Sequence, residues 1–195
     1  MPPKPKFKKE EIIAAAMEIV SKKGIDALTA QELRNALRCS ASPIFTVFNT
    51  MKEIQDEVRI SAMQRFEEFV GTDLPDMPIF KQIGMQMIMF GVQEPKLYQL
   101  LFMQENHNAD TFDDVFGELG DTAVLCIDAI KKDYGLTGEQ AKILFENVWI
   151  YTFGIGALCA TKVCNFSEAE LGQMLTTEFQ AMMMLIKSEK SDEKK

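Results

Sequence analysis

The sequence predicts an all-α protein in which an N-terminal three-helix helix-turn-helix domain is joined to a larger helical bundle, with about nine helices in total. Apolar residues recur at helical spacing along almost the whole chain, and no segment alternates as a strand would. Three helix starts also fall between residues 29 and 53, and short helices this close together are typical of a helix-turn-helix. The 195 residues are 47% hydrophobic, which suffices for a packed core in one large domain or two small ones.

The first helix is expected over Lys9–Lys23, because Ile12, Ala16 and Val20 lie on one face at helical spacing. Gly24 follows it and can adopt the left-handed conformation that ends many helices. The lysines just before this glycine suit the partial negative charge of a helix C-terminus. A single amphipathic helix therefore precedes the cluster of short ones.

Three N-cap signals follow the first helix. Thr29 and Thr50 each precede a glutamate by three positions, which is the pattern of a capping box. Between them, Ser42 precedes Pro43, an N-cap followed by proline at the first helical position. These signals predict a second helix from Thr29, a third over about Pro43–Phe48 and a fourth from Thr50. Because such short helices are unstable alone, they must pack on a neighbouring element.

Further helices are expected after the fourth, which should end near Val70. Their predicted ranges are Ile79–Val92, a short segment from Pro95, Thr111–Lys132, Thr137–Val163 and Ser167 to about Lys187. Thr137 with Gln140 and Ser167 with Glu170 are two more capping boxes. The last two helices are long, apolar and close together in sequence.

The charge is distributed unevenly along the chain. The formal net charge is −8, yet residues 1–59 carry ten Lys and Arg against eight Asp and Glu, while the rest is strongly acidic. Lys4, Lys6, Lys8 and Lys9 are concentrated in a proline-rich N-terminal arm. A basic end on an acidic chain indicates a nucleic-acid contact at that end, and a solvated tail is the alternative.

Several functional classes find no support in the residues. The four cysteines form no CxxC pair and there is one histidine, so we expect no metal site and no cofactor. The cysteines should be free thiols, with redox sensing by Cys159 or Cys164 as the alternative. No nucleophile–base arrangement or phosphate-binding glycine loop suggests an enzyme. Without a signal peptide or an apolar run of the roughly 18 residues that a membrane span needs, we expect a cytoplasmic protein that does not enter the membrane.

In a helix-turn-helix the second short helix enters the major groove of double-stranded DNA, and the first lies against the backbone. We expect Thr29, at a helix start with free amides, and Lys52 to contact phosphates. The residues expected to face the groove are Ala41, Ser42, Pro43, Phe45 and Thr46. Since none of them is an Arg, Asn or Gln, specificity should come from methyl contacts, hydroxyl hydrogen bonds and DNA shape. The alternative is that the two short helices merely cap a bundle.

The segment from Ile12 to Val58 resembles the DNA-binding domain of TetR/AcrR-type bacterial regulators. The residues that carry this resemblance are Gly24, Thr29, Leu33-Arg34, Arg38-Cys39-Ser40, Ile44 to Phe48 and Met51 to Ile54. Arg38 stands where the family usually has glycine, and Phe45 stands for a tyrosine whose hydroxyl commonly touches a phosphate. Further along, Glu94–Phe102 and Trp149–Gly154 are similar to segments of the family's regulatory domains.

The resemblance implies a homodimer joined by the last two long helices, and the sequence supports this with apolar and small residues there. The interface is expected at Gly154, Ala157, Leu171, Leu175, Phe179, Met182 and Ile186. Packing of both faces within one chain is the alternative. The resemblance also implies a pocket for a small, largely apolar effector, expected at Phe66, Met85, Met89, Phe102, Phe116, Trp149 and Phe153.

The chain is therefore expected to be a TetR-type transcriptional regulator, a repressor released from its operator by that effector. A small-molecule sensor of the same fold without sequence-specific DNA binding is the alternative. The corresponding division assigns residues 1–52 to the DNA-binding domain, 53–188 to the ligand-binding and dimerisation domain, and 189–195 to a disordered tail.

Overall fold

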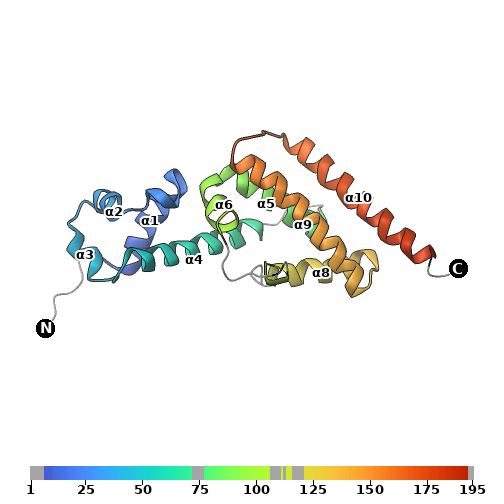
Figure 1. Ribbon diagram of the computed structural model, residues 1–195, viewed down its shortest axis with the longest axis horizontal. Helices are drawn as coiled ribbons and strands as arrows, with labels where there is room; N and C mark the ends of the chain where they lie inside the picture. The colour runs from blue at the N-terminus through green and yellow to red at the C-terminus, as the bar shows by residue number, and fades with distance from the viewer. Residues whose placement is uncertain (1–6, 72–76, 106–110, 112, 116–120, 193–195) are drawn as a thin grey trace.

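The computed structural model describes residues 7–71, 77–105, 111, 113–115 and 121–192. Within these residues the chain is helical and has no strand, so the all-α prediction is confirmed. The helices are α1 Lys9–Lys23, the short 3-10 helix η1 Ile25–Ala27, α2 Ala30–Leu37, α3 Ala41–Phe45, α4 Met51–Val70, α5 Ile79–Gln93, α6 Pro95–Phe102, α8 Asp121–Tyr134, α9 Gly138–Ala160 and α10 Glu168–Asp192. Figure 1 shows α1 to α3 at one end, α10 at the other, and α4 running from the first group into the bundle.

The helix starts lie close to their predicted positions, but the capping differs in detail. The Thr29 hydroxyl accepts a hydrogen bond from the Glu32 amide at 3.2 Å, and Thr50 does the same for Glu53 at 3.1 Å. At the α2 start, the predicted return contact of the Glu32 carboxylate with the helix N-cap is replaced by an ion pair with Lys23 of α1. Thr137 with Gln140 forms the complete box that was predicted.

Three predicted boundaries are corrected by the structure. α3 begins at Ala41 instead of Pro43, with Ser40 in the extended conformation as its N-cap. α9 ends at Ala160, and α10 continues through Asp192, past the expected end near Lys187. Part of the helix predicted over residues 111–132 lies outside the described residues, and α8 begins at Asp121.

The three N-terminal helices share a core with the start of α4. Leu33 of α2, Ile44 of α3 and Ile54 of α4 are fully buried and pack with Ile12 and Ala16 of α1. The same apolar cluster continues into Phe90 and Leu97 of the bundle, so the two halves of the molecule share one core. Burial of these side chains, each contributing roughly 1.5–3 kcal/mol, explains why helices as short as α2 and α3 are stable here.

α9 is the central helix of the bundle and contacts α5, α6, α8 and α10. By length and composition it could cross a membrane, with a mean hydropathy of 1.5, so the expectation that no stretch is apolar enough was wrong. Its apolar residues, among them Leu144, Phe145 and Ile155, instead fill two core clusters of the bundle. These contacts are typical of a core helix.

α6 crosses α9 at an unusually close approach. The Tyr98 ring of α6 lies fully buried over Gly156 of α9, and its hydroxyl donates to the Phe153 carbonyl at 3.1 Å. Gln99 donates to the Ala160 carbonyl at 2.7 Å. A Cβ at Gly91 of α5 would lie 2.9 Å from the Gly156 carbonyl oxygen. α5, α6 and α9 therefore meet at a point where two glycines allow the close approach.

α6 also contacts the N-terminal helices, which makes it one of the links between the two halves. It packs against α1 and α4. Arg59 of α4 donates to the Leu100 carbonyl at 3.2 Å, and Arg65 forms an ion pair with Glu94 just before α6. A change in the bundle that moves α6 would therefore be transmitted to α4.

Candidate functional site

α3 presents a narrow exposed face over a buried one. Ser42, Phe45 and Thr46 are exposed, whereas Ile44 and Phe48 are buried against the other N-terminal helices. Of the remaining predicted groove-facing residues, Ala41 and Pro43 are half-buried. The structure thus brings the predicted residues together on one short helix, with Ser42, Phe45 and Thr46 as its most accessible part.

The geometry of α3 depends on a tight local hydrogen-bond pattern. The Thr46 hydroxyl donates to the Ser42 carbonyl at 2.8 Å, and the Phe48 amide donates to the Ile44 carbonyl at 3.1 Å. Pro43 lies in the first turn, where a backbone N–H has no acceptor within the helix and its absence costs nothing. Helical backbone therefore persists beyond Phe45 and fixes the direction of the Thr46 side chain.

The turn between α2 and α3 carries an arginine in a conformation that favours glycine. Arg38 has φ 49° and ψ 49°, the left-handed region, and the Cys39 amide donates back to the Arg34 carbonyl at 3.1 Å. A non-glycine residue in this conformation costs about 1–2 kcal/mol. The Arg38 side chain is exposed beside α3, although Arg38 was not among the residues predicted to contact DNA. The sequence feature that could have identified Arg38 is its occurrence at a position where the resembled family usually has glycine.

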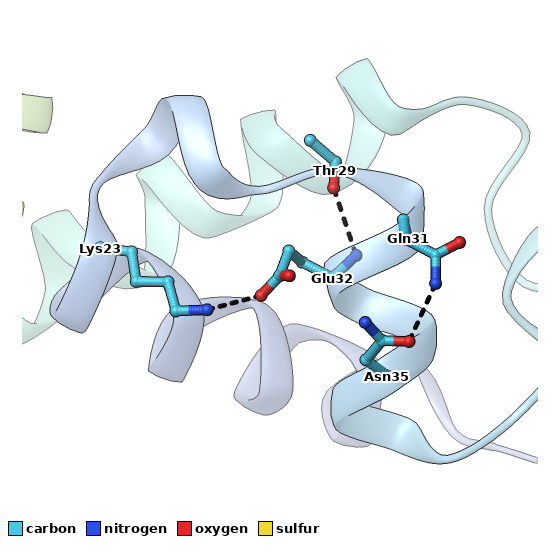
Figure 2. A network of polar contacts seen from close by, with 5 residues as sticks. All are labelled: Lys23, Thr29, Gln31, Glu32 and Asn35. Atoms are coloured by element: carbon cyan, nitrogen blue, oxygen red, sulfur yellow. Dashed lines mark hydrogen bonds and ion pairs between the residues drawn. The ribbon is translucent and has the colours of Figure 1, made fainter.

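Polar contacts hold the start of α2 against α1. Lys23 pairs with Glu32 at 2.6 Å, Thr29 caps the helix, and the Gln31 amide donates to Asn35 at 2.9 Å. Figure 2 shows these contacts. Thr29 is exposed, but its hydroxyl oxygen already accepts from the Glu32 amide. The predicted phosphate contact at Thr29 would therefore have to come from the helix N-terminus as much as from the hydroxyl.

The α4 start supplies a second exposed cation. The Lys52 side chain is exposed and lies 3.9 Å from Asp56, a distance at which a surface ion pair contributes little. The neighbouring Glu53 carboxylate accepts hydrogen bonds from Asn49, which lower its pKa. Lys9 of α1 pairs with Glu57 at 2.5 Å, and Lys4 and Lys6 of the predicted basic arm lie outside the described residues.

Four of the seven residues predicted to line an effector pocket pack in one apolar cluster, which contains Phe66, Phe102, Trp149 and Phe153. Phe66 contacts Phe102 edge-on at 5.0 Å between ring centroids, and Trp149 stacks on Phe153 at 5.3 Å. Met85 and Met89 pack in a different cluster with Leu171 and Leu175. Phe116 lies outside the described residues. The described side chains of this set form parts of the core.

A cavity that was not predicted from the sequence lies between α5, α8, α9 and α10. Its volume is about 170 Å³, and Phe80, Lys81, Tyr134, Thr176 and Phe179 contribute to its lining. No local sequence signal marks it, because its walls come from four helices. None of the residues predicted to bind an effector borders it.

The predicted interface residues mostly face into the chain. Leu171, Leu175 and Ile186 are buried, Phe179 and Met182 are half-buried in a core cluster, and Ala157 packs on the core that includes Ala160. Gly154 is exposed, and a Cβ there would meet no atom within 4 Å. The physical reason is that α10 packs its widest apolar face against α5 and α9 of its own chain.

A different set of apolar side chains is exposed on these two helices. Ile150 of α9 is 51% exposed and Met184 of α10 is 74% exposed. The other exposed members are Ile143 and Leu158 of α9 and Leu185 of α10. Together with Gly154, these exposed residues of α9 and α10 are called the α9–α10 face.

The cysteines are free and differ in accessibility. Cys126 is buried, and burial raises the pKa of its thiol to about 12. Cys159 is also buried, and burial followed by the nearby Cys164 raises its pKa. Cys39 and Cys164 are half-buried. Because the thiolate is the reactive form, these environments predict unequal reactivity.

With an aromatic disulfide reagent at pH 8, Cys39 and Cys164 are expected to react in the native protein, and Cys126 only after unfolding. At that pH a thiol of pKa about 12 is ionised to about one part in ten thousand. Mass mapping of the modified residues checks this, and the Cys126→Ser variant should retain the native reaction amplitude. Rapid modification of Cys126 in folded protein would contradict it.

Three solved structures resemble this chain over nearly its whole length. A TetR variant from Acinetobacter baumannii AYE, in complex with minocycline, is 17% identical with a TM-score of 0.53, and the match covers 94% of this chain and 96% of that one. A protein described as a TetR-family transcriptional regulator from Vibrio parahaemolyticus is 18% identical with a TM-score of 0.60, covering 90% and 98%. A third, described in the same way, from Mesorhizobium loti MAFF303099, is 18% identical with a TM-score of 0.56, covering 90% and 95%. No family model matches the sequence, and no curated protein matches it either.

Proposed function

We propose that this chain, which has the fold of the TetR-family transcriptional regulators, is itself a DNA-binding regulator of transcription. The observation that carries the proposal is the exposed face of α3, where Ser42, Phe45 and Thr46 stand over the buried Ile44. A short helix held in this way by two others is the arrangement that enters the major groove. A regulator that binds the bacterial chromosome would be located in the cytoplasm.

The charged residues around α3 fit contacts to the DNA backbone. Arg38 precedes α3 and Lys52 follows it, and both side chains are exposed. Cations that flank a neutral reading face are suited to phosphates, which fix the position of the helix but carry no sequence information. Ser42 and Thr46 would donate to or accept from base edges, and Phe45 would contact thymine methyl groups.

The same fold could sense a small molecule without binding specific DNA. The contacts of α6 with both halves favour a coupled regulator, because they connect the bundle to α4 and hence to α3. A repressor released by a small, largely apolar effector is the form that we propose. The effector would bind more tightly to the state with the wrong half-site spacing. The reduction in DNA affinity would be limited by the difference between the effector's affinities for the two states.

Gel shifts with the DNA upstream of the chain's own coding sequence test the proposal. The wild-type protein should give a shift that survives excess nonspecific DNA at about 0.1 M salt, because phosphate contacts alone weaken steeply with salt. Replacement of both Ser42 and Thr46 by alanine should alter operator preference. A sensor without DNA recognition would show no specific shift and no effect of these substitutions.

We further propose that the chain acts as a homodimer through the α9–α10 face. Two recognition helices must lie about 34–36 Å apart to read successive major grooves, which requires two copies of α3. Exposed apolar side chains on adjacent long helices are typical of such an interface, and Gly154 would allow a partner helix to approach closely. The interface would thus consist of the α9–α10 face. The buried residues that were first expected there, such as Leu171 and Leu175, would keep their contacts within their own chain.

Substitution of Ile150 by glutamate is expected to convert the dimer to a monomer at micromolar concentration. The added carboxylate would be buried in the interface without a partner, which costs several kcal/mol. Sedimentation velocity checks the result. The control is Val124→Glu on α8, where the side chain is 60% exposed but lies outside the α9–α10 face, and it should remain dimeric. A monomeric wild type would contradict the dimer proposal.

A further inference from the structure

The cavity between α5, α8, α9 and α10 has the size of a small-molecule site. Its volume of about 170 Å³ is close to that of an apolar cavity, about 150 Å³, that holds a benzene ring. A second hollow, lined by Tyr134, Phe179, Gln180 and Lys187 among others, adjoins it along α10. The two hollows share Tyr134, Phe179 and Gln180 as lining residues.

The walls of this cavity are mainly apolar, and three of the lining residues are aromatic. Phe80 of α5 and Tyr134 of α8 both contact Phe179 of α10, with ring centroids 6.2 Å and 4.9 Å from it. Val148 of α9 and Leu175 of α10 complete the apolar surface. Such walls suit a flat apolar group, because rings prefer tilted or offset contacts at about 4.5–7 Å.

The cavity also contains one charged group, and that group is positive. Lys81 of α5 is half-buried, and its ammonium donates to the Thr176 hydroxyl of α10 at 2.9 Å. The Thr176 hydroxyl itself donates to the Gly172 carbonyl at 2.7 Å, so it holds the ammonium in place. An ammonium has three donors, and no Asp or Glu of the described chain lines the cavity. A ligand anion would complete this arrangement.

We propose that this cavity binds a small carboxylic acid whose apolar part is about the size of one aromatic ring. The carboxylate lies against the Lys81 ammonium, and the ring lies among Phe80, Tyr134 and Phe179. Thr176 acts as a positioning residue through its hydrogen bond to Lys81. The role of this ligand as an effector rests on the proposed function, and it makes the effector class amphipathic instead of purely apolar.

The position of the cavity explains how such a ligand would influence the dimer. Thr176, Phe179 and Gln180 line the cavity from α10, the helix that also carries Met184 of the α9–α10 face. A ligand that fixes α10 against α5 also fixes the part of the proposed interface that α10 provides. Binding and DNA affinity would then be linked with no contact between the ligand and α3.

Isothermal titration calorimetry with benzoate and with benzyl alcohol tests the site in the full-length protein. Benzoate should bind more tightly than the neutral alcohol of the same ring. Lys81→Met should weaken benzoate at least about tenfold, the size expected for loss of a charge-assisted hydrogen bond, while binding of benzyl alcohol changes little. The control variant Lys131→Met removes the same charge from an exposed ion pair on α8 and should bind benzoate normally.

Two results would overturn the site. One is benzoate binding to Lys81→Met as tightly as to wild type, and the other is no binding of either compound at millimolar concentration. If Lys81→Met fails to fold, Thr176→Val provides a second test. This variant preserves the shape of the cavity but removes the hydroxyl that positions the Lys81 ammonium, so benzoate binding should weaken. Gel shifts with added benzoate separate the proposals: binding without an effect on DNA affinity removes only the effector role. Absence of specific DNA binding removes the proposed function, and calorimetry still decides the site.

Discussion

Replacement of Gly156 by alanine is expected to destabilise the protein by about 3 kcal/mol, because the added methyl group has no room. A Cβ at this position would lie 2.7 Å from Cζ and 2.9 Å from Cε2 of Tyr98, and closer still to the hydroxyl oxygen. Tyr98 is fully buried, so its ring can move only by giving up its packing and its hydrogen bond to Phe153. The transition temperature should fall by about 10 °C in a thermal melt.

Two further variants make this expectation specific. Gly138→Ala introduces the same methyl group at the start of the same helix, where no atom lies within 4 Å, and should be nearly neutral. Tyr98→Phe combined with Gly156→Ala should cost less than the sum of the single changes, because the closest contact is with the hydroxyl. Additive losses would show that the crossing of α6 and α9 is less tightly packed than described.

Replacement of Ser42 by glutamate is expected to weaken specific DNA binding at least about a hundredfold without loss of stability. The side chain is exposed on the reading face of α3, where a carboxylate would meet the phosphates and the acceptor-rich groove. An acidic residue in the first turn of a helix is favourable for the helix itself. Fluorescence anisotropy with labelled operator DNA measures the affinity, and circular dichroism measures the fold.

The matched control for this change is Gln64→Glu. It adds the same charge to an exposed position of α4, thirteen residues, or about 20 Å, beyond the helix start. Its DNA affinity should stay within about threefold of wild type, since charges farther than a Debye length of about 8–10 Å are largely screened. Equal losses in both variants would indicate a general charge effect, and the α3 reading face would then be wrong.

Features set by local periodicity could be predicted from the sequence. Phe45 was expected to face the groove and is exposed, while Ile44 and Phe48, which lie one turn apart on the other side of the segment, are buried. The Thr caps of α2 and α4 were predicted for the same reason, because a cap involves residues only three apart. The second half of these two boxes was not predicted correctly, because the Glu32 carboxylate pairs with Lys23 of α1 and the Glu53 carboxylate accepts hydrogen bonds from Asn49.

Features that depend on the choice between two partners could not be predicted. The apolar stripe of Leu171, Leu175 and Ile186 correctly indicated burial, but a stripe does not reveal whether its own chain or a second copy covers it. The cavity around Lys81 has the same difficulty. Its walls come from four helices, and the hydrogen bond from Lys81 to Thr176 joins residues 95 positions apart.

The length of α4 has a mechanical consequence. Its 20 residues form a rod of about 30 Å, with α3 at one end and the bundle at the other. A rotation of about 10° around the bundle end would displace the α3 end by about 5 Å, and in the proposed dimer the two displacements would add. The separation of the reading helices would then change by about 10 Å, or about three base pairs at 3.4 Å each, against a required spacing of about 34 Å. A small angular change at the bundle is thus amplified into a mismatch that duplex DNA cannot accommodate without bending.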